Sequence, residues 1–176
     1  MRLKRWIVVC IAALPAVGCG TSGGQLTIPQ SDNTYPLVLL DVVPTGASLM
    51  TVTTHSLPIT LHVKSNDSLS FVGLAVDDDG GAQNIQIWQT VRQCRNIGGG
   101  LVTCSGPGTP GAPAKDNPDT GKKPGDIANT RRVVAMTLDM HPLTIGFDSV
   151  EVKVWAVGIN FSNLSEQTQE VTLEYP

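Results

Sequence analysis

The sequence predicts an all-β protein, an antiparallel sandwich of seven or eight strands that follows an N-terminal signal helix and a flexible tether. Apolar and polar residues alternate with a period of two in several short segments, which is typical of strands with one buried face. The 18 Gly and 12 Pro residues separate these segments with turns. No sustained helical period follows Cys19, so short strands in a sandwich are the simplest reading of the exported part of the chain.

Residues 1–18 have the composition of a secretory signal peptide. Arg2, Lys4 and Arg5 precede an apolar run from Trp6 to Val17, the usual order of charged and apolar regions in such signals. The run is too short for a membrane-spanning helix, which needs roughly 20 apolar residues. We therefore exclude residues 1–18 from the mature fold.

The signal ends in Ala16-Val17-Gly18-Cys19, which resembles the lipobox of bacterial lipoproteins, although Leu is more usual where Ala16 stands. The resemblance implies that the Cys19 sulfur receives diacylglycerol and that its new amino group receives a further acyl chain. Two or more acyl chains suffice for stable anchoring. We expect a protein of the bacterial cell envelope, anchored to the outer or cytoplasmic membrane with its domain outside the cytoplasm. Ordinary secretion, with cleavage near Gly20 or Ser22, is the alternative.

The mature chain is acidic and has no run of basic residues. Loss of the signal removes three of the 12 basic residues and none of the 15 acidic ones, which leaves a net charge of −6. Nucleic acids and anionic lipid headgroups need clustered Lys and Arg, so neither is an expected partner. The expected partners are the membrane, through the lipid on Cys19, and an unidentified protein or glycan. No cofactor is expected.

The mature chain divides into a tether and one domain. Residues 19–34 are small and polar and predict a flexible linker, and residues 35–176 have the size of a single domain. The segments expected to form strands are Leu37 to Val43, Ser48 to Thr53, Ile59 to Lys64, Leu69 to Val76, Asn84 to Gln93, Arg132 to Met140, Val150 to Ala156 and Gln169 to Tyr175.

The segment from Ser105 to Thr130 interrupts this pattern. It contains five Gly, five Pro and almost no large apolar side chain, so we expect a long loop at 105–130. Long loops in compact domains are either functional or disordered, and the sequence leaves both readings open.

Two cysteines remain for the folded domain, because Cys10 leaves with the signal and Cys19 is expected to carry lipid. An even number of cysteines in an oxidising compartment predicts a disulfide, here between Cys94 and Cys104. The glycines Gly98 to Gly100 between them favour a turn, because glycine reaches positive φ without steric penalty.

Two stretches resemble the immunoglobulin-like domains of bacterial surface proteins. In the first, Val72 to Gly81 contains an Asp-Gly corner that runs into Ile85-Gln86-Ile87. In the second, Val150 to Ala156 runs into Asn160-Phe161-Ser162, followed by a closing strand from Glu170 to Tyr175. The resemblance implies an immunoglobulin-like sandwich and a non-catalytic extracellular module for spacing, adhesion or assembly. The two cysteines and the Gly/Pro segment stand where this family has an ordinary middle strand pair.

Two clusters could bind a metal. The carboxylates of Asp77, Asp78 and Asp79 are suitable oxygen ligands for calcium, although Asp side chains in turns also bond to nearby backbone amides. His55, His62 and His141 could in principle bind zinc, but they lack the close spacing of typical zinc ligands. We expect the aspartates to stabilise a turn and His62 to be solvated, and we assign no metal ligand.

No sequence pattern indicates catalysis. The chain lacks a Gly-x-Ser-x-Gly nucleophile elbow, and disulfide-bonded cysteines offer no thiolate, so we name no catalytic residue and expect no enzyme. Trp88 and Trp155 have polar neighbours at alternate positions, which places them on outer strand faces, as recognition sites or as caps on the sheet. The expected function is a membrane-anchored binding, adhesion or structural module. The alternatives are a metal-dependent or carbohydrate-active enzyme domain and an accessory subunit of an envelope assembly.

Overall fold

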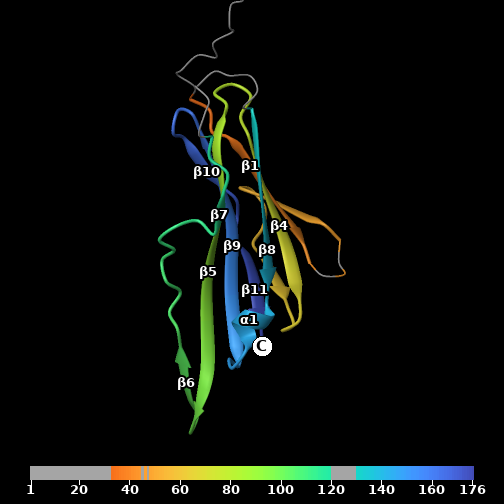
Figure 1. The fold of residues 1–176 in the computed structure, drawn as a ribbon, viewed down its shortest axis with the longest axis vertical. Coiled ribbons are helices and arrows are strands. Elements are labelled where there is room, and N and C mark those ends of the chain that lie inside the picture. The colour runs from red at the N-terminus through yellow and green to blue at the C-terminus, as the bar shows by residue number, and fades with distance from the viewer. Residues whose placement is uncertain (1–32, 45, 47, 120–129) are drawn as a thin grey trace, which may run out of the picture.

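The chain folds as an immunoglobulin-like β-sandwich, which confirms the predicted fold class (Figure 1). The computed structural model describes residues 33–44, 46, 48–119 and 130–176. In this part of the chain there are one helix of four residues and eleven strands, more than the seven or eight expected, because three short strands join the expected set. The expected signal peptide, the lipid-carrying Cys19 and all of the expected tether except Asn33 and Thr34 lie outside the described residues.

The first sheet contains four strands, all paired antiparallel, in the order β2-β1-β4-β8. They are β1 (Leu37–Val43), β2 (Met50–Thr53), β4 (Ser68–Val76) and β8 (Arg131–Asp139). The central strand β4 is buried at every second residue, including Leu69, Phe71 and Ala75. This alternation is the physical basis of the period of two in the sequence.

The second sheet has the order β3-β11-β9-β5-β6, with two short strands added beside it. Its strands are β3 (Ile59–His62), β5 (Ala82–Gly98), β6 (Leu101–Cys104), β9 (Ser149–Asn160) and β11 (Val171–Tyr175). The short strands are β7 (Lys115–Asp116), paired with β5, and β10 (Ser165–Gln167), paired with β9. Strand β3 pairs parallel with β11, whereas the other pairs of this sheet are antiparallel.

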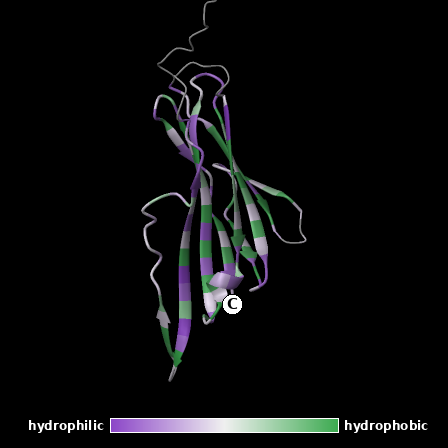
Figure 2. Cartoon of the chain, in the orientation of Figure 1, coloured by the Kyte–Doolittle hydropathy of each residue, from purple (hydrophilic) through white to green (hydrophobic). Residues whose placement is uncertain are grey.

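The hydrophobic core lies between the two sheets. Apolar and polar residues alternate along β5 and β9 (Figure 2), and the apolar set faces the first sheet. Fully buried members include Leu40 and Phe71 of the first sheet and Ile87, Val152 and Leu173 of the second. At roughly 25 cal/mol for each Å² of apolar surface removed from water, this interleaved layer is the main stabilising contribution to the fold.

A strand forms in each of the eight segments expected to form strands. Two of these strands are clearly longer than expected. Strand β1 has the expected bounds, Leu37–Val43. Strand β9 extends to Asn160, and β5 extends from Ala82 to Gly98 because its last residues form a hairpin with β6. The hairpin carries the expected disulfide between Cys94 and Cys104, which are directly paired residues.

The Gly/Pro-rich segment is not entirely the loop that its composition predicts. The backbone amides of Ala114, Asn117 and Asp119 donate hydrogen bonds to carbonyl oxygens of β5, so this part runs along the strand edge. The Asp119 carboxylate also forms an ion pair with Arg132 of β8, and both side chains are largely buried. Backbone pairing needs no large apolar side chains, which is why composition alone does not reveal it. Residues 120–129 lie outside the described part.

Helix α1 (His141–Thr144) joins β8 to β9. Its Pro142 stands in the first turn, where a missing N–H costs nothing. Among the described residues, no helix has both the length and the apolar character needed to cross a bilayer.

Gly158 of β9 marks a close approach of the two sheets. A Cβ atom at this position would lie 2.6 Å from Val38 Cγ2 and 3.0 Å from Ala75 Cβ, both in the facing sheet. We expect Gly158→Ala to lower the free energy of unfolding by about 1–3 kcal/mol, since overpacking forces side chains and backbone apart. Urea denaturation measures the change.

Gly106→Ala is the matched control, because a Cβ atom there would meet nothing within 4 Å. The urea midpoint of the Gly106→Ala variant should stay close to that of the unsubstituted protein. Equal midpoints for the two variants would show that the sheets do not approach each other at Gly158.

Candidate functional site

The outward face of the second sheet carries a pair of tryptophans at its centre. Trp88 of β5 and Trp155 of β9 are directly paired across the strands. Their ring centroids are 6.4 Å apart and their planes differ by 10°, an offset arrangement that aromatic rings favour. Both side chains are half-buried, while Ile87 and Ala156 beside them point into the core with no exposed surface. The prediction that both tryptophans lie on outer strand faces is therefore confirmed.

Polar groups orient and border the tryptophan pair. The Trp88 indole Nε1 donates a hydrogen bond of 3.0 Å to Gln86 Oε1, which fixes one ring on the strand. On the neighbouring row, Lys153 Nζ lies 3.4 Å from Glu170 Oε2. The patch therefore combines apolar ring surface with an amide and an ion pair, and it can offer both stacking and hydrogen bonding to a ligand.

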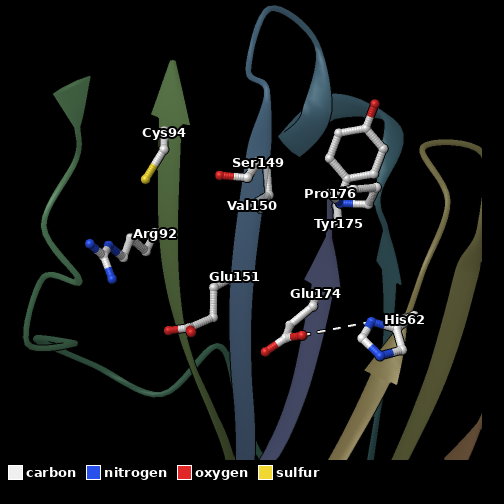
Figure 3. A pocket seen from close by; sticks show the side chains of 9 residues that line it. All are labelled: His62, Arg92, Cys94, Ser149, Val150, Glu151, Glu174, Tyr175 and Pro176. Atoms are coloured by element: carbon white, nitrogen blue, oxygen red, sulfur yellow. Dashed lines mark ion pairs between the residues drawn. The ribbon is translucent and has the colours of Figure 1, made fainter. Parts of the chain in front are cut away.

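A hollow of about 690 Å³ lies beside the tryptophan pair, next to Tyr175 and Pro176 at the C-terminal end of the chain. Four charged or titratable side chains form a row across it, from Arg92 of β5 through Glu151 and Glu174 to His62 of β3 (Figure 3). His62 Nδ1 lies 3.6 Å from Glu174 Oε2. The parallel pairing of β3 with β11 places His62 directly opposite Glu174.

The hollow provides a solvated charged surface rather than a desolvated catalytic cleft. The His62 side chain is 84% exposed and that of Glu174 is 46% exposed, so water screens the interaction between them. The hollow therefore presents exposed polar and charged groups on the outer face of the second sheet.

Asp77 stabilises the corner between β4 and β5. Its Oδ1 atom accepts hydrogen bonds from the backbone amides of Asp79, Gly80 and Gly81, at 3.2, 2.7 and 3.1 Å. Asp77 is buried, whereas Asp78 and Asp79 are exposed. The corner is thus closed by a side chain that bonds to nearby backbone amides, as expected from the sequence.

The three histidines do not come together. His55 follows β2, His62 lies on β3 and His141 begins α1. In the part of the chain that the structure describes, no three His, Cys, Asp or Glu side chains are grouped so as to hold a metal ion.

The row from Arg92 to His62 was not predictable as a unit from the sequence. Each of its four residues occupies an outward position of its strand, and that part of the pattern is readable from the alternation. Their alignment depends on strand order and register, which bring residues 62, 92, 151 and 174 side by side. Local sequence carries no signal for such a parallel pairing between β3 and β11.

The chain matches no protein-family model, and no curated protein matches its sequence.

Proposed function

We propose that this protein is a lipid-anchored, extracytoplasmic binding module that performs no chemistry. Cys19 would carry the anchor, and the sandwich would present its recognition surface to the cell envelope. The ligand best suited to this surface is a glycan chain of the envelope.

The observation that carries the proposal is the tryptophan pair on the solvent-facing side of the second sheet. The core is complete without these rings, because Ile87, Val154 and Ala156 fill the inner side of the same strands. Each ring is half-buried, so the pair presents a partly exposed aromatic surface, and tryptophan is among the residues most enriched at the centre of binding sites.

The polar surroundings favour a glycan over an apolar peptide. A sugar ring has a flat apolar face, which packs on an aromatic ring, and hydroxyl groups around its rim. Gln86 and the Lys153–Glu170 pair border the rings and can exchange hydrogen bonds with such hydroxyl groups. The acidic net charge of the mature chain also disfavours a polyanionic ligand.

The proposal predicts that the unlipidated mature chain, residues 19–176 with Cys19→Ala, sediments with insoluble peptidoglycan or envelope polysaccharide. Replacing Trp88 and Trp155 together by Ala should reduce the bound fraction at least tenfold, since truncating an anchoring tryptophan commonly costs about 2 kcal/mol or more of binding free energy. Co-sedimentation measures the bound fraction.

Val133→Ala serves as the control, because Val133 is 51% exposed on the other sheet and its loss should leave binding unchanged. Circular dichroism shows whether each variant retains its strands. Failure of the parent chain to bind either polymer, or equal binding by the double tryptophan variant, would reject the proposed ligand surface.

A further inference from the structure

The edge strand β6 leaves backbone hydrogen-bonding groups free. The Ser105 amide donates to the Gln93 carbonyl oxygen, and Thr103 is paired with Arg95, so the odd-numbered residues of this segment turn their backbone groups toward β5. In an antiparallel pair these groups alternate along the strand. The N–H and C=O groups of Val102 and Cys104 therefore point away from β5, and no other strand of the described chain pairs with β6.

This edge lacks the features that normally prevent strand addition. Natural edge strands are commonly protected by charged side chains, Pro or a covering loop. No residue from Asn96 to Thr109 is charged, and β6 contains no Pro. Leu101 and Val102 are 64% and 63% exposed. The edge thus combines free backbone groups with exposed apolar side chains.

The position of the hairpin leaves room for a second strand. The tip of the β5–β6 hairpin extends past the sandwich, at the end of the long axis opposite the first described residues (Figure 1). The disulfide between Cys94 and Cys104 joins the two strands at the base of this extension. A docked strand would therefore meet a hairpin that is already held in its extended form.

We propose that β6 is a self-association edge, at which it pairs antiparallel with β6 of a second copy of this chain. The twofold axis passes beside Thr103, so that Val102 of each copy faces Cys104 of the other. Both residues of each such pair have outward backbone groups, which gives four N–H···O=C bonds between the copies. The second sheets of the two molecules then become continuous.

A second copy fits this edge for two reasons. The strand has no charge, so a like strand brings no like-charge repulsion, and the outward groups of Val102 and Cys104 are symmetric about Thr103, as an isologous contact requires. A four-residue strand buries much less than the roughly 800 Å² for each partner that stable complexes bury. The proposed dimer is therefore weak and forms only at high local concentration.

The test uses the oxidised, unlipidated mature chain, residues 19–176 with Cys19→Ala, at concentrations from about 10 µM to about 1 mM, a range in which weak complexes of small interface form. Sedimentation equilibrium should show monomer at the low end and dimer at the high end. Over the same range, amide hydrogen exchange should slow at least fivefold for Val102 and Cys104. The Thr103 amide, which faces β5, should exchange at the same rate at the lowest and the highest protein concentration.

Val102→Pro removes one outward N–H without touching the bonds to β5, a substitution that edge strands tolerate, and it should abolish the dimer. Val102→Thr keeps the N–H, so this variant should still form the dimer. Persistent slow exchange at Thr103 shows that the Pro variant still forms the hairpin. A chain that stays monomeric at the highest concentration with unchanged exchange at Val102 and Cys104, or a Pro variant that still dimerises, would overturn the proposal.

Discussion

Cys19→Ala should abolish fatty-acid labelling of the protein and leave an uncleaved precursor that retains residues 1–18. The thiol itself is the proposed acceptor of diacylglycerol, and in lipoproteins cleavage before the cysteine follows its modification. Metabolic labelling with a radioactive fatty acid, followed by gel electrophoresis, measures both the label and the processing.

Cys10→Ala is the matched control for this experiment. Cys10 lies inside the apolar run of the signal, and alanine is equally apolar there, so labelling and cleavage should match those of the parent chain. Label incorporated at the parent level by Cys19→Ala, or cleavage near Gly20 or Ser22 without any lipid, would reject the lipobox assignment.

Phe71→Ala should lower the free energy of unfolding by about 3–5 kcal/mol, as burial of a large aromatic side chain predicts. Phe71 has no exposed surface and lies at the centre of the first sheet, paired with Val42 of β1 and Met136 of β8. Folded domains are stable by only about 5–15 kcal/mol, so this single change removes a large part of the total. Urea denaturation followed by circular dichroism measures it.

The comparison for Phe71 is the outward neighbour on the same strand. Val72 is half-buried on the opposite face of β4, so Val72→Ala should cost clearly less than Phe71→Ala. A loss of under 1 kcal/mol for Phe71→Ala would mean that the two sheets do not form one packed core at this position.

Strands with one buried face were predictable from local sequence. Strand β9 is the clearest case, since every second residue from Val150 to Asn160 is buried, and an alternation of this length has no helical equivalent. The position of Trp155 followed directly, because it falls among the outward residues. The same reasoning placed Trp88 on the outer face of β5.

Features that depend on pairing between distant segments were not predictable. Strand β7 has only two residues, and its bonds to Gln86 and Ile87 of β5 involve backbone groups that every residue possesses. The hollow between Arg92 and His62 likewise arises from register across four strands. The period of two fixes which face a residue occupies but leaves its neighbours on adjacent strands open.

The central claim, that the outward face of β5 and β9 recognises an envelope glycan, is tested most directly by nuclear magnetic resonance. The ¹⁵N-labelled chain of residues 19–176 with Cys19→Ala contains two tryptophans, Trp88 and Trp155, and thus two indole N–H signals. Titration with soluble peptidoglycan fragments or envelope oligosaccharides should shift both signals saturably, together with backbone amides of β5 and β9. Unchanged indole signals at saturating ligand, or shifts confined to the β6 hairpin or to the hollow beside Glu174, would contradict the account.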